Sequence, residues 1–403
     1  KMHHNIDRDL LVDVLKQQNS ILNLSSKSKE NIDLLKLKNT FSITTGHQLC
    51  LFTGPLYFIY KIVSTLNLCE QLYSKYPENN FVPIFWLASE DHDFREVNHI
   101  YLYGKKIEWQ ATQDGAVGNM NLDGFNDVIS ELRLVLGSHK NANKIILFFE
   151  QIYLNSNNLA DATRCLLNEL FGSYGLVIID GNDKLLKRRF IPQMKKDMIK
   201  RGFFTEIQKC SNSLAKEYHM QAHIREINFF RLSKAKRELI TEEVSEKEIE
   251  NNSEKFSPNV LLRPMYQEAI LPNIAYVGGQ AEIAYWMQLK TAFSQEMIPF
   301  PILVLRNSAL LIDDSQQRVL KKLGFNIRDI FLSENLLKKQ YILTNINSSI
   351  SLEIDKKELV SLYNNIRSKT SDVGLQSSIM SQLRKQVNFF ENMQDKMIKS
   401  EKK

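Results

Sequence analysis

Short apolar or β-branched runs alternate with longer segments of helical periodicity through most of this chain. We predict that five of these runs are β-strands, at Phe41–Thr45, Phe81–Ala88, Tyr174–Asp180, Ile274–Gly278 and Phe300–Leu305. Strands separated by helices usually pair in parallel, because a parallel connection has to cross the face of the sheet. The pattern therefore predicts an α/β fold with a Rossmann-like, mostly parallel sheet.

The segments between these strands predict additions to the sheet. Residues Tyr101–Trp109 have the pattern of a β-hairpin around Gly104. Residues from about 124 to 171 and from 182 to 256 are mainly helical in pattern, and we interpret them as helical insertions between sheet strands. We expect residues 1–335 to form one core that carries these insertions.

Residues 336–403 have a different pattern, in which apolar side chains fall at the a and d positions of a heptad frame. These side chains are Leu359, Leu362, Ile366, Val373, Met380, Leu383, Val387, Phe390 and Met397, and the polar interruptions are Lys369, Gln376 and Gln394. The run Ser368–Gly374 is a poor helix interior, so an antiparallel hairpin of two helices is expected. We predict that this coiled-coil arm makes a homodimer.

The charge balance argues against nucleic acid as a partner. The formal net charge is +6, but residues 336–403 hold 12 Lys/Arg and 7 Asp/Glu and so account for +5 of it. The remaining core is nearly neutral, without the basic balance of an extensive phosphate-binding groove.

The lengths of the apolar runs and the spacing of the cysteines bear on the cellular location of the protein and on the redox state of its thiols. No window reaches about 18 uninterrupted apolar residues, and the first residues have no apolar signal-peptide core, so we expect no membrane association and a cytoplasmic location. Cys50, Cys69, Cys165 and Cys210 include no Cys-x-x-Cys pair. We therefore expect reduced thiols and no metal site.

The first candidate site follows the strand predicted at Phe41–Thr45. Two glycines and several polar residues lie between this strand and a helical segment, which predicts an anion site at a helix N-terminus. Its candidate ligand-binding residues are Thr45, Gly46, His47, Gln48, Thr53, Gly54, Tyr57 and Lys61. Alternatively, the glycines serve only turn and packing roles, His47 caps the helix, and Lys61 is solvated.

The second candidate site is the polar run that follows the strand Phe81–Ala88. Glu90, Asp91 and His92 are candidate catalytic residues, because adjacent carboxylates and an imidazole can take a proton or orient an amine. The alternative is a solvated strand end with a helix cap at Asp93. Carboxyl ends of parallel strands share one edge of a sheet, so the first and second sites should lie together.

The third candidate site surrounds the pair Gly278-Gly279, which again separates a strand from a helix. Aromatic and polar residues close to this pair predict a pocket for a polar small molecule, and a plain tight connection is the alternative. The candidates are Arg263, Asn273, Tyr276, Gly278, Gly279, Gln280, Glu282 and Tyr285, with Arg306 and Asn307 after the next strand.

Four motifs in order carry a resemblance to a known family. They are Thr-Gly-His-Gln-x5-Gly-Pro-Leu-Tyr (Thr45–Tyr57), Phe-Trp-x3-Glu-Asp-His-Asp-Phe (Phe85–Phe94), Phe-Ser-Pro-Asn-Val-x2-Arg-Pro (Phe256–Pro264) and Tyr-Val-Gly-Gly-x-x-Glu-Ile-Ala-Tyr-Trp (Tyr276–Trp286). Together they strongly resemble the BshC family, the cysteine-adding enzymes of bacillithiol synthesis. The resemblance runs from about Thr40 to the coiled-coil tail. It implies a Rossmann-like core with helical connecting insertions, a coiled-coil dimerisation arm and a distant likeness to class I aminoacyl-tRNA synthetases.

The resemblance also implies an activity. A ligase of this family adds L-cysteine to glucosaminyl-malate by forming an amide bond, and ATP with its magnesium is the simplest means of activating the carboxylate. On this interpretation Gly46, His47 and Gln48 bind phosphate or the activated carboxylate, Glu90, Asp91 and His92 position or deprotonate the amine, and Arg263 and Arg306 pair with malate carboxylates. The alternative is a nucleotide- or sugar-binding scaffold without chemistry. Family members are longer at both ends, so we expect this chain to be incomplete.

Overall fold

The computed structural model describes residues 6–233, 236–345 and 352–401, and it contains two compact units. The first unit ends at Ser308 and the second begins at Ala309, whereas the sequence pattern predicts this boundary between residues 335 and 336. The residues just before position 336 pack with the helices that follow them. The rings of Phe325 and Tyr341, for example, lie 6.3 Å apart.

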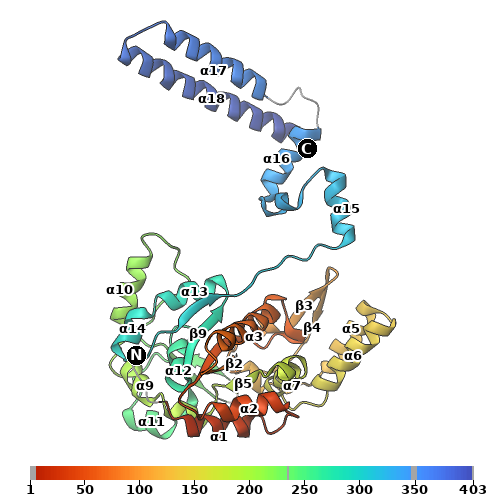
Figure 1. The fold of residues 1–403 in the computed structure, drawn as a ribbon, viewed down its shortest axis with the longest axis vertical. Coiled ribbons are helices and arrows are strands. Elements are labelled where there is room, and N and C mark those ends of the chain that lie inside the picture. The colour runs from red at the N-terminus through yellow and green to blue at the C-terminus, as the bar shows by residue number, and fades with distance from the viewer. Residues whose placement is uncertain (1–5, 234–235, 346–351, 402–403) are drawn as a thin grey trace. The chain divides into compact units, whose positions relative to one another are not determined.

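The first unit is built on a five-stranded sheet in the order β10-β9-β1-β2-β5, with every neighbouring pair parallel (Figure 1). Its strands are β1 (Thr40–His47), β2 (Asn80–Leu87), β5 (Val177–Asp180), β9 (Asn273–Gly278) and β10 (Ile302–Leu305). All five predicted strands are present, and the predicted α/β fold class is confirmed. Leu87 lies in register with both His47 and Asp180, so β1, β2 and β5 end level with one another.

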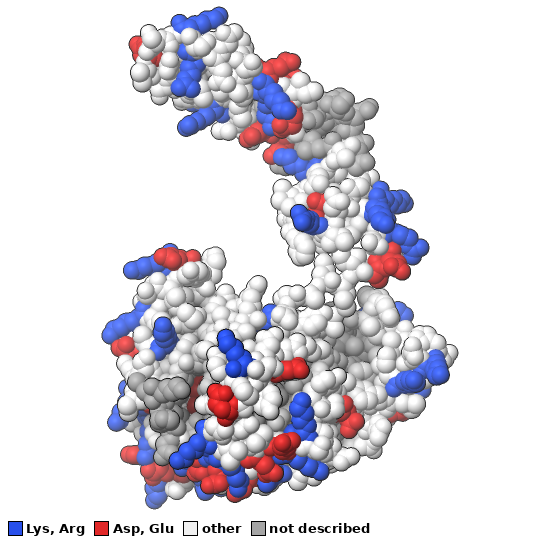
Figure 2. All heavy atoms as spheres, in the orientation of Figure 1, with Lys and Arg blue, Asp and Glu red and all other residues white. Residues whose placement is uncertain are grey.

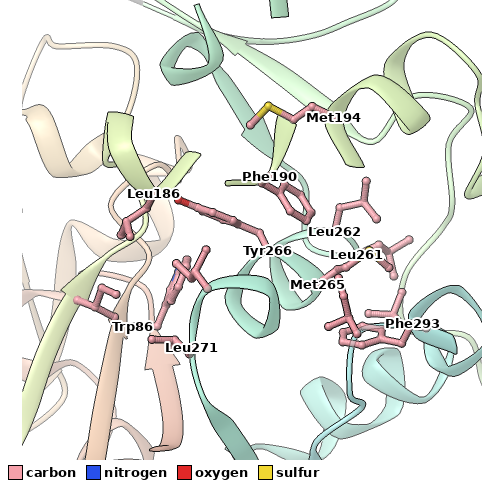
Figure 3. Packing of buried hydrophobic residues seen from close by; sticks show 14 of the residues in the cluster. Trp86, Leu186, Phe190, Met194, Leu261, Leu262, Met265, Tyr266, Leu271 and Phe293 are labelled. Atoms are coloured by element: carbon pink, nitrogen blue, oxygen red, sulfur yellow. The ribbon is translucent and has the colours of Figure 1, made fainter. Parts of the chain in front are cut away.

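Helices cover both faces of this sheet because its strands are apolar on both sides. Along β2, Val82, Ile84 and Trp86 enter one hydrophobic core, while Phe85 and Leu87 enter another. Helices α1 (Arg8–Gln18), α2 (Ser26–Leu34) and α12 (Arg263–Ile270) contribute to the first core, and α3 (Tyr57–Lys75) contributes to the second. Figure 3 shows Trp86, Phe190 and Tyr266 together in the first core.

The first predicted insertion is confirmed as helical. It contains α5 (Phe125–Leu136), α6 (Lys140–Tyr153) and α7 (Leu159–Phe171), which pack into the second core. The predicted hairpin before it is also present, as β3 (His99–Leu102) and β4 (Lys105–Glu108), after the short helix α4 (Phe94–Val97). Tyr103 and Gly104 at its turn have φ of 51° and 78°, the left-handed conformation that tight hairpin turns require.

The second predicted insertion is only partly helical, and this corrects the sequence interpretation. It contains α8 (Lys184–Arg188), α9 (Ile191–Met198), α10 (Phe204–Leu214) and α11 (Glu246–Asn251). It also contributes an antiparallel sheet of β6 (Phe229–Leu232), β7 (Arg237–Leu239) and β8 (Phe256–Pro258). These strands are too short, and β7 too charged, to show the apolar alternation by which strands are predicted. Helices α13 (Gln280–Met287) and α14 (Lys290–Gln295) follow β9.

The second unit is helical within the part of the chain that the structure describes. Its helices are α15 (Asp314–Leu323), α16 (Glu334–Asn345), α17 (Glu353–Ser368) and α18 (Val373–Glu401). Helices α17 and α18 form the predicted antiparallel hairpin (Figure 1). The hairpin turns where expected, because the Asp372 side chain accepts hydrogen bonds from the backbone N–H groups of Gly374 and Leu375 and so starts the second helix.

Charged side chains of both signs are interspersed on the face that Figure 2 shows. This mixing agrees with the near-neutral composition of residues 1–335. Among the residues with described positions, no helix is both long and apolar enough to cross a membrane.

Candidate active site

A cavity of about 640 Å³ lies in the first unit at the carboxyl ends of β1 and β2. The antiparallel sheet of the second insertion supplies another part of its lining, through Phe230, Arg237, Ser257 and Pro258. The cavity brings together residues from all three candidate sites. Those that line it are Gly46, His47, Gln48, Lys61, Glu90, Asp91, Arg263, Glu282 and Tyr285.

An ion pair between Lys61 and Glu282 joins two of the candidate sites. Lys61 on α3 is 2% exposed, and its Nζ lies 2.6 Å from Oε2 of Glu282 on α13. Oε2 also accepts a hydrogen bond from the Gly279 N–H at 2.8 Å, and Oε1 accepts one from the Tyr276 hydroxyl at 2.7 Å. Burial works to raise the pKa of Glu282, but Lys61 and these hydrogen bonds outweigh it and leave the pKa lowered. Glu282 is therefore an ionised carboxylate with both oxygens engaged.

The expected anion-binding turn after β1 has a different geometry. Gly46 lies inside β1, opposite Trp86, and a Cβ there would lie 2.8 Å from the Trp86 carbonyl oxygen. Gly54 has a φ of 58°, and a Cβ there would lie 2.5 Å from Cβ of Cys50. Helix α3 begins only at Tyr57, after a 3₁₀ turn. Close packing thus accounts for both glycines, and the structure shows no tight strand–turn–helix cradle at Gly46.

His47 lines the cavity as a neutral imidazole. Its ring lies 5.4 Å from the ring of Tyr57 and 5.1 Å from that of Phe58. Burial, and then the charge of Lys61, lower the pKa of His47 to about 4. At neutral pH this side chain offers a hydrogen bond, but no charge, to a ligand.

Asp91 is held at the end of β2 by several donors. Its Oδ1 accepts hydrogen bonds from the backbone N–H groups of His92, at 2.7 Å, and Asp93, at 3.4 Å, while Oδ2 accepts one from Gln48 Nε2 at 2.8 Å. Burial works to raise the pKa of Asp91, but the Gln48 hydrogen bond and the charge of Arg237 leave it lowered. Asp91 is therefore a fixed anion and a weak base.

Arg237 is a cation of the cavity that the sequence analysis did not select. It comes from β7, its side chain is 10% exposed, and its guanidinium lies 4.0 Å from the ring centroid of Phe230. It donates hydrogen bonds to the Ser257 hydroxyl and the Pro258 carbonyl oxygen. The motif Phe256–Pro264 signalled these last two partners, but nothing local in the sequence links Arg237 to them.

His92 does not line the cavity, although it was selected as a catalytic candidate. Its Nδ1 lies 3.0 Å from Nη1 of Arg237. Because a guanidinium has only donors, Nδ1 must be the accepting, unprotonated nitrogen in this contact. His92 thus contacts Arg237 from outside the cavity lining.

Several other candidates have structural roles next to the cavity. The Thr45 hydroxyl donates to the carbonyl oxygen of Val277, while Asn273 donates to Glu268 of α12 and accepts from the Thr44 hydroxyl of β1. Tyr276 is fully buried and stacks on Trp286 with ring centroids 4.4 Å apart. The residues that lie outside the lining are Thr45, Thr53, Gly54, Tyr57, His92, Asn273, Tyr276, Gly278, Gly279, Gln280, Arg306 and Asn307.

Arg306 follows β10 directly and is not a lining residue, although its charge acts on the lining residues His47 and Lys61. Its guanidinium is 5.1 Å from the ring centroid of Tyr57, and its Nη1 donates to the carbonyl oxygen of Asn307. Among the described residues, no group of three His, Cys, Asp or Glu side chains could hold a metal ion.

The fold and the cavity define a class of protein before any comparison is made. A parallel Rossmann-like sheet with a polar cavity at its carboxyl edge is typical of proteins that bind or convert small molecules. Residues 1–307 match the family model "Bacillithiol biosynthesis BshC, N-terminal Rossmann-like domain", and residues 309–403 match the C-terminal coiled-coil domain of the same family. The chain belongs to the BshC family.

Curated relatives agree with this assignment. A protein of Flavobacterium psychrophilum is 43% identical, in an alignment covering 99% of this chain and 78% of the relative. A protein of Flavobacterium johnsoniae is 42% identical, with 99% and 79% covered, and both are named "Putative cysteine ligase BshC". A tyrosyl-tRNA synthetase structure from Archaeoglobus fulgidus covers 96% of this chain and is itself 99% covered, but its TM-score of 0.27 and 11% identity support no argument.

Proposed function

We propose that this protein is a ligase that joins the carboxyl group of L-cysteine to the amine of glucosaminyl-malate, forming bacillithiol. The family assignment supports the reaction class. The observation that carries the proposal is the composition of the cavity, where guanidinium groups of Arg237 and Arg263 occur together with carboxylates of Glu90 and Asp91. A substrate with both carboxylates and an amine needs this combination of partners.

The residue roles follow from which groups reach the cavity. Arg263 remains a candidate to pair with a malate carboxylate, and its Nη2 already donates to the Tyr285 hydroxyl at 2.8 Å. Arg237 takes the second such role in place of Arg306, which does not line the cavity. Glu90 and Asp91 face the amine, while His92 supports the site from outside the lining, through its backbone N–H to Asp91 and its imidazole contact with Arg237.

ATP is proposed as the source of activation on chemical grounds, because a carboxylate does not acylate an amine unaided at neutral pH. The first strand end does not fit a phosphate cradle. Gly46 is packed against Trp86, and Lys61 is already paired with Glu282. We therefore assign no residue to the nucleotide and derive no step through it.

The proposal includes the assembly and location of the protein. We propose a cytoplasmic homodimer that associates through the hairpin of α17 and α18. Large apolar side chains on this hairpin are exposed, including Leu362, Ile366 and Phe389. Such a surface is what a coiled-coil partner buries.

The direct test is to incubate the purified protein with cysteine, ATP and glucosaminyl-malate and to detect bacillithiol by mass spectrometry. The Flavobacterium psychrophilum relative is assayed in parallel, and Asp91→Asn serves as the matched variant. We expect product from this chain and a large loss of rate in the variant. Product from the relative but none from this chain would contradict the proposal and favour a binding scaffold.

A further inference from the structure

A buried lysine from the second insertion contacts one of the cavity carboxylates. Lys187 on α8 is 0% exposed, and its Nζ lies 2.5 Å from Oε1 of Glu90. The same Nζ donates hydrogen bonds to Oδ1 of Asn182, at 2.9 Å, and to the carbonyl oxygen of Glu254, at 3.0 Å. The ammonium is thus aligned on these two neutral acceptors and meets Glu90 as a close ion contact. Its position is fixed by Asn182, just before α8, and by Glu254, in the turn before β8.

The two carboxylate oxygens of Glu90 lie in different surroundings. Oε1 is fully buried and is in ion contact with Lys187, without a hydrogen bond from the described residues. Glu90 lines the cavity, and no donor to Oε2 is found among the residues whose positions are described. Since the side chain is 14% exposed and Oε1 is not, Oε2 is the oxygen that the cavity can reach.

In the other two cavity carboxylates, each oxygen already accepts a hydrogen bond from the protein. Both oxygens of Asp91 accept hydrogen bonds, from Gln48 and from backbone N–H groups. Both oxygens of Glu282 are likewise engaged, by Lys61 and Tyr276. Among the described lining residues, Glu90 is therefore the carboxylate with an oxygen that accepts no protein hydrogen bond, and this oxygen is the most open acceptor for a donor that enters the cavity.

We propose that Lys187 is a positioning residue that fixes Glu90 so that Oε2 accepts a hydrogen bond from the primary amine of the substrate. This inference rests on the proposed function, because it concerns the amine-bearing substrate, and it deepens that function by assigning amine recognition to one carboxylate. A hydrogen bond to a charged acceptor in a partly buried site contributes substantially to affinity. The ligand class is a primary amine, and an analogue without the amine loses this contact.

Calorimetry with two ligands tests the inference. Glucosaminyl-malate is compared with 2-deoxyglucosyl-malate, the analogue that has hydrogen in place of the amine at C2. We expect the wild-type protein to bind the amine about 10- to 100-fold more tightly, the scale of a hydrogen bond to a charged group. The ratio of the two affinities is the readout, since a merely structural loss weakens both ligands alike.

Two variants and one control separate the roles. In Glu90→Gln the introduced amide must turn its oxygen to the Lys187 ammonium, which puts its NH₂ toward the cavity and removes the acceptor. We expect the preference for the amine to disappear there and to fall at least threefold in Lys187→Met. Lys184→Met, on the same helix but 53% exposed, should keep the wild-type ratio.

Each outcome decides one claim. A wild-type ratio near one, or an unchanged ratio in Glu90→Gln, overturns the assignment of amine recognition to Glu90. If the affinity ratio is unchanged in folded Lys187→Met but falls in Glu90→Gln, the positioning role of Lys187 is overturned. If Lys187→Met does not fold, Glu90→Gln still tests the assignment of amine recognition to Glu90. Failure of the wild-type protein to bind either ligand contradicts the proposed function instead.

Discussion

Nζ of Lys61 lies 2.6 Å from Oε2 of Glu282 and also donates a hydrogen bond to the carbonyl oxygen of Gly46. One ammonium therefore joins α3, α13 and the end of β1 beside the cavity. Burial lowers the pKa of Lys61, and the charge of Glu282 opposes this shift. Each charge of such a pair depends on the other, because neither is well solvated.

The first prediction concerns this ion pair. Lys61→Met should lower the free energy of unfolding by about 3 kcal/mol, because it leaves the Glu282 carboxylate uncompensated. The measurement is urea unfolding at pH 7. Combining Lys61→Met with Glu282→Gln should restore part of the loss, since no unpaired charge remains. Lys75→Met, at the exposed end of the same helix, is the control, and an equal loss there would count against the pairing.

The second prediction concerns the two kinds of glycine at the strand ends. Gly46→Ala should destabilise the fold by about 1–3 kcal/mol, the usual cost of overpacking, because its Cβ meets the Trp86 backbone. Gly279→Ala should cost less than about 1 kcal/mol, because its nearest neighbour is the end of the Glu282 side chain, 3.4 Å away. Thermal or urea unfolding compares them. Similar losses for both would show that packing against Trp86 is not what requires Gly46.

Sequence periodicity predicted the parallel sheet because each of its strands is rich in apolar or β-branched residues and these runs alternate with helical segments. It missed β6, β7 and β8, which are three or four residues long and include Arg231, Arg237 and Glu238. The pairing of these strands depends on packing against residues that are distant in the sequence, and a local sequence pattern cannot predict such packing. The role of Gly46 was ambiguous in the same way. A glycine needed for close packing against a neighbouring strand cannot be distinguished in sequence from a glycine needed for the close approach of a ligand.

The candidate site was predictable where polar or charged residues come soon after the end of a predicted strand. Glu90, Asp91 and Glu282 were selected in this way, and they line one cavity because parallel strands bring their carboxyl ends to one edge. Lys187 and Arg237 were not selected, since Lys187 meets Glu90, and Arg237 reaches the cavity, through tertiary contacts of the insertion alone. The sequence also gave no means of knowing that His92 lies outside the lining.

The third prediction concerns Arg237. Arg237→Lys should raise KM for glucosaminyl-malate about tenfold or more, because an ammonium cannot reproduce the planar fork that pairs with a carboxylate. Arg231→Lys is the matched control, on the neighbouring strand and 42% exposed, with its charge paired to Glu248. Steady-state kinetics of both variants provide the comparison. If the two variants raise KM equally, Arg237 has no special role in binding the substrate.

The fourth prediction concerns the second unit. Leu362→Lys combined with Ile366→Lys should convert a dimer to a monomer in light scattering, because both side chains are exposed on α17 and belong to the heptad pattern. Leu134→Lys, on an exposed position of α5, should leave the mass unchanged. Removing residues 309–403 should have the same effect as the double variant. A dimer that persists in both would place the main interface elsewhere.

The fifth prediction uses a buried acid in α12. Glu268 is 3% exposed, and its Oε1 accepts hydrogen bonds from Gln267 and Asn273, each at 2.8 Å. Burial raises the pKa of Glu268 to about 8, above the ordinary value of 4.5, and the two hydrogen bonds offset only part of this shift. The folded protein therefore binds a proton that the unfolded chain releases between these two values. The stabilising contribution is complete below about pH 4.5 and is lost as the pH rises through about 8.

Glu268→Gln imitates the protonated acid at every pH, so it should remove this dependence. We expect the free energy of unfolding of the variant, relative to wild type, to increase between pH 5 and 9 with a slope of at most about 1.4 kcal/mol per pH unit. The comparison cancels the contribution of Asp197, whose pKa burial raises to about 7 in both proteins. Urea unfolding at several pH values gives the slope, and Glu131→Gln on the exposed face of α5 should give none. A difference between Glu268→Gln and wild type that stays constant over this range would mean that Glu268 is already ionised in the folded protein, with a partner that compensates its charge.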